Sequence, residues 1–335
     1  MKITGTFIDE ITHDIPSSNW GEREWEADFQ AMKYIGIDTV IIIRNGYRNL
    51  ATFNSKVLSS NFDMINAPID LLELFLSLSD KYGINLFFGT YDSGKYWMNG
   101  DYQREVDINK AFTEEVNDKY GHHPSFQGWY ISHEIDTYNP DVMNVYRQLG
   151  NHLKGLRDIP ILISPYIHGK KQFAEDPTSL EQHKESWDKV FAEIRDCVDI
   201  VAFQDGNVDY AELYDYLLVN SKLAKKYQLT GWTNVETFDR DVLIKFPPIN
   251  WPALCHKMDA ATRSGVDKMI TFEFSHFMSP FSIYPAARHL YDRYCESVGL
   301  TPLNAGVESD TIRLGEILSD RLENSIADTS ALSNM

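Results

Sequence analysis

Two glutamates occupy matching positions in this chain, each at the end of a short apolar run that is typical of a β-strand. Glu134 ends the run 126–134, and Glu236 ends the run 228–236. A pair of carboxyl groups is the equipment for cleaving a glycosidic bond, because one protonates the leaving oxygen while the other attacks the anomeric carbon. We therefore predict that Glu134 is the acid/base and Glu236 the nucleophile of a catalytic pair.

Alternation along the two runs indicates where these carboxylates point. Side chains of a strand face opposite sides in turn, so Glu134 shares a face with Tyr130 and Ser132. By the same rule Glu236 shares a face with Asn234. An unpaired carboxylate is costly to bury, so two inward glutamates at strand ends need a functional reason.

The elements that would position the pair alternate along the chain. Short apolar runs suited to strands cover 3–8, 39–44, 84–90, 127–133, 160–166, 199–204, 229–235 and 268–274. Amphipathic runs suited to helices cover 22–35, 68–82, 103–120, 140–156, 179–195, 209–227, 250–264 and 284–298. Alternating strands and helices imply parallel pairing through crossovers. Eight such units favour a closed (β/α)8 TIM barrel of the α/β class over an open doubly wound sheet, since no Gly-rich phosphate turn follows the first strand.

The expected domain organisation is a single barrel domain over residues 1–300, followed by an acidic, peripheral tail over 301–335. Catalytic residues of such barrels gather at the carboxyl ends of the strands. Glu134 and Glu236 follow the fourth and seventh strands, so both should reach that mouth. The connections after the strands are long and those after the helices are short, which marks the same face as functional.

Further polar and aromatic residues at strand ends and in the long connections are candidates for binding sugar hydroxyls or stacking on sugar rings. The predicted substrate-binding residues are Arg44, Tyr91, Trp97, His133, Tyr166, His168, Gln204, Asn234 and Glu273. Among them, Arg44 is predicted to hold the nucleophile in its ionised form by proximity.

Composition narrows the choice of partners. The net charge of −18 over 335 residues argues against nucleic acid, an anionic membrane surface and a polyanionic substrate, and fits a neutral one. Three scattered cysteines and the lack of Cys-x-x-Cys or His-x₃-His spacing predict neither a disulfide framework nor a metal site, and no cofactor is expected. Neither a signal peptide nor an apolar run of the ~20 residues of a membrane span is evident, so a cytoplasmic enzyme is expected.

Several motifs resemble one bacterial family, catalogued as domain of unknown function 4434. They are Gly5-Thr-Phe-Ile-Asp-Glu10, Asn19-Trp-Gly-Glu-Arg-Glu-Trp25, Gly36-Ile-Asp-Thr-Val-Ile-Ile-Ile-Arg44 and Gly128-Trp-Tyr-Ile-Ser-His-Glu134. The resemblance covers most of residues 1–298 and implies a barrel fold and glycoside hydrolase activity.

More distantly, the chain resembles the clan A glycoside hydrolases, retaining enzymes with an acid/base on strand four and a nucleophile on strand seven. Glu134 and Glu236 match those positions, and Arg44 matches an arginine often found after strand two. Departures from the clan pattern affect the expected sugar specificity. They are His133 in place of Asn, Gln204 in place of Tyr, and Phe272 with Glu273 in place of a strand-eight Trp.

Two other functions fit the same barrel. A divalent-metal sugar isomerase or epimerase would bind its ion through carboxylates and an imidazole at several strand ends. Its ligands would come from Glu134, His168, Asp205, Glu236 and Glu273. A carbohydrate-binding barrel without turnover is the other alternative.

Overall fold

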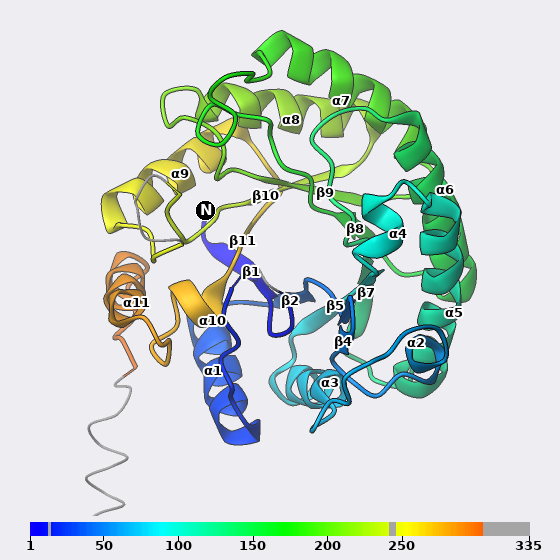
Figure 1. Cartoon of the computed structure of the whole chain (residues 1–335). Helices are drawn as coiled ribbons and strands as arrows, with labels where there is room; N and C mark the ends of the chain where they lie inside the picture. The colour runs from blue at the N-terminus through cyan, green and yellow to red at the C-terminus, as the bar shows by residue number, and fades with distance from the viewer. Residues whose placement is uncertain (13–14, 241–245, 304–335) are drawn as a thin grey trace, which may run out of the picture.

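The computed structural model describes residues 1–12, 15–240 and 246–303. Eight parallel strands close into a barrel in the order β1-β11-β10-β9-β8-β7-β5-β2 (Figure 1). They are β1 (Ile3–Ile8), β2 (Thr39–Ile42), β5 (Asn85–Gly89), β7 (Phe126–Tyr130), β8 (Ile161–Ile163), β9 (Ile200–Gln204), β10 (Thr230–Asn234) and β11 (Lys268–Thr271). Because β1 pairs with both β2 and β11, the sheet has no free edge, and the TIM-barrel prediction is confirmed over the open sheet.

A ring of helices surrounds the barrel, as the alternation predicts. The ring consists of α1 (Glu22–Ile35), α3 (Leu71–Tyr82), α5 (Tyr102–Tyr120), α6 (Pro140–Leu156), α7 (Leu180–Ile194), α8 (Leu213–Tyr227), α9 (Trp251–Ser264) and α11 (Pro285–Ser297). Local chemistry sets their ends. Asn139 caps α6, which has Pro140 in its first turn, and Gly36 ends α1 with φ 95°, a left-handed conformation that glycine adopts without strain.

Two apolar cores hold these layers together. One fills the barrel and includes Phe7, Tyr130 and Ile270. The other lies between the strands and the helices and includes Trp129 and Ile131. Tyr130 therefore points into the barrel while both of its neighbours point outward, as alternation predicts for the segment that leads to Glu134.

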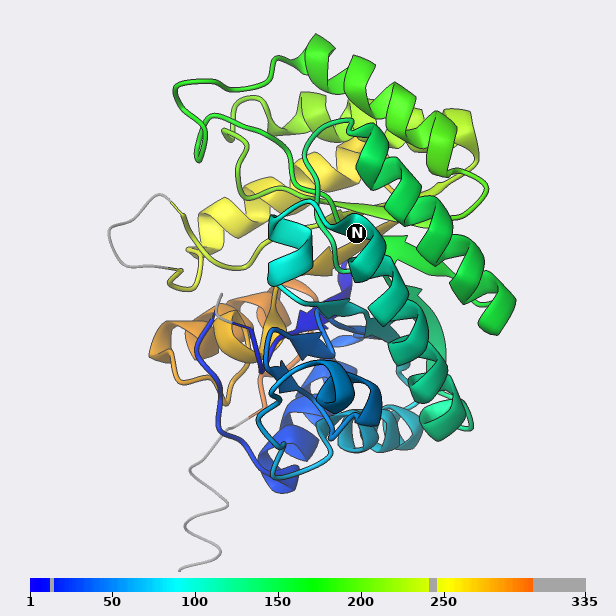
Figure 2. The ribbon, with the colours of Figure 1, turned by 45° about the vertical axis from the view of Figure 1, so that its right-hand side comes forward.

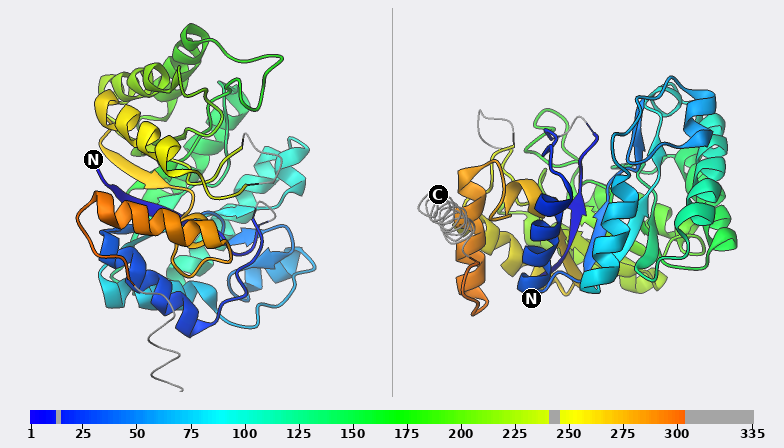
Figure 3. Two further views of the ribbon diagram at one scale, coloured as in Figure 1. Left: turned by 90° about the vertical axis from the view of Figure 1, so that its left-hand side faces the viewer. Right: turned by 90° about the horizontal axis from the view of Figure 1, so that it is seen from below.

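Additional short elements lie in the connections after the strands. Three of them are helices, namely α2 (Lys56–Asn61), α4 (Lys95–Met98) and α10 (Phe274–Phe277). Three short strands, β3 (Gly46–Tyr47), β4 (Leu50–Ala51) and β6 (Tyr91–Asp92), form a separate sheet in the order β4-β3-β6. Figures 2 and 3 show the long connections gathered at one end of the barrel, the end to which the strands point. This end is the predicted functional face.

Most of the predicted tail, 301–335, lies outside the described residues, which end at 303. Within the described ranges, no helix is both long and apolar enough to cross a membrane.

Candidate active site

A pocket of about 290 Å³ opens at the carboxyl ends of the strands, and both predicted catalytic glutamates line it. Glu134 lies four residues beyond β7, and Glu236 lies two residues beyond β10. The two carboxylates thus reach one cavity from different sides of the barrel. Of the predicted substrate-binding residues, Tyr166, Gln204 and Asn234 also line the pocket.

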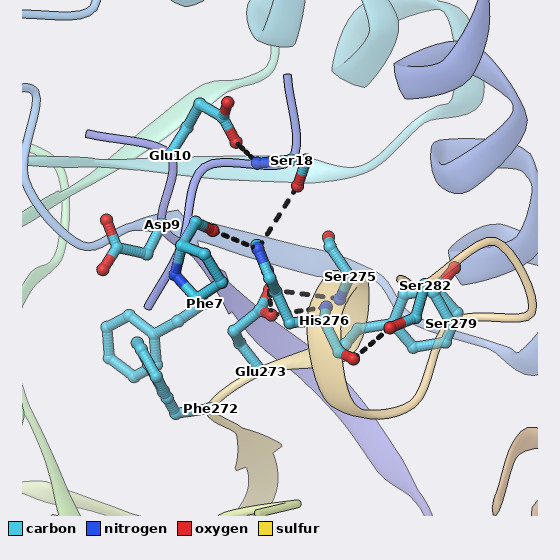
Figure 4. Close-up of polar contacts among 12 residues, drawn as sticks. Phe7, Asp9, Glu10, Ser18, Phe272, Glu273, Ser275, His276, Ser279 and Ser282 are labelled. Carbon is cyan, nitrogen blue, oxygen red and sulfur yellow. Dashed lines mark hydrogen bonds and ion pairs between the residues drawn. The ribbon is translucent and has the colours of Figure 1, made fainter. Parts of the chain in front are cut away.

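One wall of the pocket is aromatic. Phe272 lies 6.1 Å from Phe7 and 6.0 Å from Phe238, measured between ring centroids. Phe238 in turn lies 4.6 Å from Phe246. These rings come from β1, from the end of β11 and from the connection after β10, so they form one continuous apolar surface beside the glutamates. Figure 4 shows Phe7 and Phe272 next to each other.

Polar side chains form much of the remaining lining. Gln204 donates from Nε2 to the carbonyl of Ser164 at 2.8 Å. Asn234 is buried, and its Oδ1 has no hydrogen-bond partner among the described residues. A buried acceptor without a partner is costly, so a ligand hydroxyl that donates to it would relieve that cost. The further polar residues of the lining are Ser164, Tyr166, Gln172, Asn207 and Arg240.

Arg240 forms a two-point ion pair with Glu236. Its Nε donates to Oε2 at 3.1 Å and its Nη2 to Oε1 at 3.0 Å, while Glu236 is only 2% exposed. Burial lowers the pKa of the Arg240 guanidinium, but the Glu236 carboxylate outweighs burial and raises it. A guanidinium bound to both oxygens fixes the orientation of the carboxylate.

Arg44, the residue predicted for that role, has another partner. Its Nε lies 3.4 Å from Oδ2 of Asp92, and its guanidinium lies 5.7 Å from the centre of the Tyr47 ring. We therefore correct the prediction: the guanidinium that pairs with Glu236 comes from Arg240 in the connection after β10. The sequence gives no periodic signal for Arg240, because it lies outside any strand or helix.

Two phenol groups lie near Glu134. The hydroxyl of Tyr130 lies 3.5 Å from Oε1 of Glu134, at the limit of a hydrogen bond. Burial raises the pKa of Tyr166 to about 12, and the charges of Asp136 and Glu134 add to this effect. The charge of Glu134 also contributes to the raised pKa of Arg240, so this guanidinium acts electrostatically on both glutamates of the pocket and binds Glu236 directly.

Gly206 leaves room for the carboxylate of Glu236. A Cβ atom added at this position would lie 1.6 Å from Oε2 of Glu236 and 2.8 Å from Nε of Arg240. Both atoms end flexible side chains, so Gly206→Ala should displace the ion pair and keep the fold. If Glu236 is the nucleophile, as predicted from the sequence, misplacing it by about 1 Å should cost roughly 10²-fold in the rate of glycoside hydrolysis, with little change in Tm. Steady-state kinetics and thermal unfolding test this.

The matched control is Gly155→Ala in α6, where nothing lies within 4 Å of the added Cβ. Turnover should be unchanged in that variant. Equal turnover in Gly206→Ala and wild type would show that the exact place of the Glu236 carboxylate is unimportant.

His133 does not bind in the pocket, so its predicted substrate contact is corrected. Its side chain is fully buried and points to the helix layer, where Nε2 lies 2.9 Å from Oε1 of Glu105 in α5. Its backbone carbonyl accepts a hydrogen bond of 2.7 Å from the hydroxyl of Tyr146 in α6. Two helices thereby fasten the residue that directly precedes Glu134. The alternation that turns Glu134 inward turns His133 outward.

The two predicted aromatic contacts of the mouth, Tyr91 and Trp97, also have structural partners. Tyr91 is fully buried, and its hydroxyl donates to the carbonyl of Arg48 at 2.7 Å. Trp97, in α4, packs 4.6 Å from the ring of His133. Neither residue lines the pocket. Both stabilise the strand-to-helix connections instead, which corrects their predicted role.

The predicted substrate contact of Glu273 is also corrected, because this residue caps a helix. The expected eighth strand, 268–274, ends at Thr271, and Glu273 is the fully buried N-cap of α10. Its carboxylate accepts from the backbone of Ser275 at 3.1 Å and from Nδ1 of His276 at 2.7 Å (Figure 4). His168 lies beside the pocket without lining it: its ring stacks on Phe173 at 3.7 Å and contacts Asp136 at 2.6 Å.

His276 should make stability depend on pH. Burial lowers its pKa, but the Glu273 carboxylate outweighs burial and raises the pKa to about 9. Because the folded-state pKa exceeds the ordinary value of about 6.5, this stabilisation is complete below about pH 6.5 and is lost as the pH rises through about 9. Between pH 7.5 and 9.5 we expect a loss of about 2 kcal/mol from this group.

Denaturant unfolding of wild type and His276→Gln at both pH values measures the effect. The stability difference between the two proteins should narrow at pH 9.5. Asp28, whose pKa burial raises to about 7, titrates below this window. A difference that stays constant with pH would exclude a charged His276.

The donors expected for a metal isomerase do not converge on one point. Glu236 pairs with Arg240, Asp205 with Lys257, and Glu273 with His276. Among the described residues, the group with ligand spacing is Asp92, Glu105 and His133. Both oxygens of Glu105 already accept hydrogen bonds and Arg44 lies against Asp92, so this cluster is organised as a buried charge network.

Comparison with known proteins identifies the family. The family model described as a domain of unknown function, DUF4434, matches residues 3–284. The chain belongs to this family. A search of curated proteins gave no match.

A solved structure similar to this DUF4434 chain comes from a near relative. A protein from Bacteroides thetaiotaomicron VPI-5482, named as a candidate α-L-fucosidase, shares 49% identity with a TM-score of 0.87. The match covers 90% of this chain and 94% of that protein.

Two more distant structures share the fold. The endo-1,4-β-D-mannanase of Thermotoga petrophila RKU-1 has 14% identity and a TM-score of 0.58, with 88% of this chain and 99% of that one covered. The β-D-glucuronidase of Dictyoglomus thermophilum has 15% identity and a TM-score of 0.53, with 91% and 51% covered. The DUF4434 chain therefore has a TIM barrel like those of glycoside hydrolases.

Proposed function

We propose that this protein is a retaining glycoside hydrolase for a neutral oligosaccharide or glycoside, with Glu236 as nucleophile and Glu134 as acid/base. The observation that carries the proposal is that both carboxylates line the same pocket, one from beyond the end of β7 and one from beyond the end of β10. Two carboxyl groups on either side of a bound glycosidic bond are what its hydrolysis requires.

The Arg240 ion pair supports this division of roles. Arg240 holds Glu236 by both oxygens, which fixes the direction of the carboxylate that is to attack. Glu134 is the other carboxyl group that lines the pocket, so it is the one available to give a proton to the leaving oxygen.

The proposed reaction has two steps. An oxygen of Glu236 attacks the anomeric carbon, the glycosidic C–O bond breaks, and Glu134 gives its proton to the leaving oxygen. Water then attacks the anomeric carbon of the glycosyl-enzyme while Glu134 takes one of its protons, and Glu236 departs as a carboxylate. No cofactor is needed for either step.

The walls of the pocket fit a sugar ring. Phe7, Phe238 and Phe272 offer flat apolar faces, on which the C–H face of a pyranose can stack. On the polar side, Asn234 presents an acceptor that has no partner in the described part of the chain, and Gln204 presents an amide. Aromatic stacking on one side with hydrogen bonds on the other is the usual division of labour in a small-molecule site.

The test is a screen of 4-nitrophenyl glycosides, beginning with the α-L-fucoside because of the name of the 49% identical relative. Each hydrolysed glycoside is then repeated with EDTA and with Glu236→Gln. Hydrolysis that survives chelation and disappears in the variant supports the proposal. Loss of activity on chelation would favour a metal enzyme. Sugar binding without hydrolysis of any bound sugar would favour a binding barrel.

A further inference from the structure

A buried ion pair lies directly behind Glu236 and is not part of the pocket. Nζ of Lys257, in α9, lies 2.7 Å from Oδ1 of Asp205, the residue that follows β9. The side chain of Lys257 is 3% exposed and that of Asp205 is fully buried. Neither residue is among those that line the pocket. Burying such a pair costs several kcal/mol per ion before the attraction between them is counted, and apolar residues often stabilise a core as well.

Both members of the pair bind the main chain of Glu236. The N–H of Glu236 donates to Oδ1 of Asp205 at 3.0 Å. The carbonyl of Glu236 accepts from Nζ of Lys257, also at 3.0 Å. The peptide groups on both sides of the Glu236 Cα are therefore hydrogen-bonded to the same ion pair. This ion pair connects the end of β9 to α9.

This arrangement leaves the Glu236 side chain little freedom. Its backbone is fixed by the ion pair, and its carboxylate is fixed by Arg240 in front. Glu236 follows β10 by two residues. On the β11 side, the N–H groups of its neighbours Val235 and Thr237 still donate to the carbonyls of Ile270 and Phe272, at 2.8 and 3.0 Å. The ion pair adds the hydrogen bonds made by the N–H and the carbonyl of Glu236 itself, which come from the end of β9 and from α9.

We propose that Asp205 and Lys257 are positioning residues for Glu236, which hold its main chain so that its carboxylate points into the pocket. The expected effect on kcat rests on the proposed function. The structural consequence, the place of the Glu236 side chain, is independent of that function.

The experiment uses the full chain with three variants. Lys257→Met alone leaves a buried carboxylate without a cation, so this variant can fail to fold. Asp205→Asn combined with Lys257→Met removes both charges, and the fold should be recovered. We expect this double variant to keep Tm within a few degrees of wild type. Its kcat should fall by about 10²-fold because the nucleophile is misplaced, with KM little changed.

A similar ion pair at the opposite end of the barrel provides a matched control. Nζ of Lys154 lies 2.9 Å from Oδ1 of Asp199, the residue directly before β9. Asp199→Asn combined with Lys154→Met makes the same chemical change far from the pocket. Its kcat should equal that of wild type.

The outcomes separate positioning from a structural role and from failure of the proposed function. Recovery of both Tm and kcat in the Asp205→Asn/Lys257→Met variant would overturn the proposal. If the wild-type protein hydrolyses no glycoside, a crystal structure of the Asp205→Asn/Lys257→Met variant decides whether the ion pair positions Glu236. Loss of the Arg240–Glu236 contacts of 3.0 and 3.1 Å in an intact barrel would support positioning, and their retention would overturn it.

Discussion

Replacing Glu236 with glutamine is expected to abolish glycoside hydrolysis while the barrel remains folded. Glutamine has nearly the same shape as glutamate but cannot attack the anomeric carbon as a carboxylate does, so kcat should fall on the order of 10⁴-fold or more. The fold should persist because the amide oxygen can still accept from Arg240, whose side chain is 21% exposed and therefore keeps access to water.

Kinetics with the best aryl glycoside and thermal unfolding together measure this effect. The control is Glu193→Gln in α7, which weakens a Glu–Arg pair between Glu193 and Arg147 on the outside of the barrel. That variant should hydrolyse the glycoside at the wild-type rate. Substantial turnover by Glu236→Gln in a protein free of wild-type contamination would contradict its assignment as nucleophile.

Replacing Glu134 with glutamine is expected to give a loss that depends on the leaving group. An acid accelerates departure of a poor leaving group by about 10²–10⁴-fold, whereas a good one such as 4-nitrophenolate leaves without a proton. For the alkyl glycoside, kcat/KM should therefore fall by roughly 10³-fold, and for the 4-nitrophenyl glycoside much less. The measurement is kcat/KM over a series of aryl and alkyl glycosides of one sugar.

The comparison with Glu236→Gln makes this prediction specific. Loss of the nucleophile should affect every leaving group alike, because the attack itself is lost. A uniform loss in Glu134→Gln, with no dependence on the leaving group, would mean that Glu134 does not supply the proton. A merely structural Glu134 would give that same uniform result.

The barrel could be predicted because its signal is repeated along the whole chain. Apolar runs such as 39–44 and amphipathic runs such as 22–35 each bury a face, and the period of that face follows from backbone geometry. The predicted helix 22–35 agrees with α1 to the residue. Alternation also indicates that Glu134 faces the barrel, because it depends only on the positions of Tyr130 and Ile131 in the same strand segment.

The contacts made by individual side chains could not be predicted in this way. Arg240 and Glu273 show why: the first lies in an irregular connection, and the second begins a short helix where a strand was expected. In both cases the path of an irregular connection decides which side chains meet. Such a connection has no periodic sequence pattern from which its path could be predicted. His133 is different, since its outward direction followed from the alternation itself and the prediction of a sugar contact neglected it.

The small sheet β4-β3-β6 has a consequence for changing the substrate range of this protein. Gly46 pairs with both Ala51 and Tyr91, so the connections after β2 and β5 are joined by backbone hydrogen bonds. The connection after β8, residues 164–179, has no helix or strand of its own, yet it supplies Tyr166, Gln172 and Phe173 to the pocket. Directed-evolution libraries should therefore vary 167–173 and leave intact both the sheet and the β-bridge between Tyr166 and Gln204, because insertions at 167–173 interrupt no helix or strand.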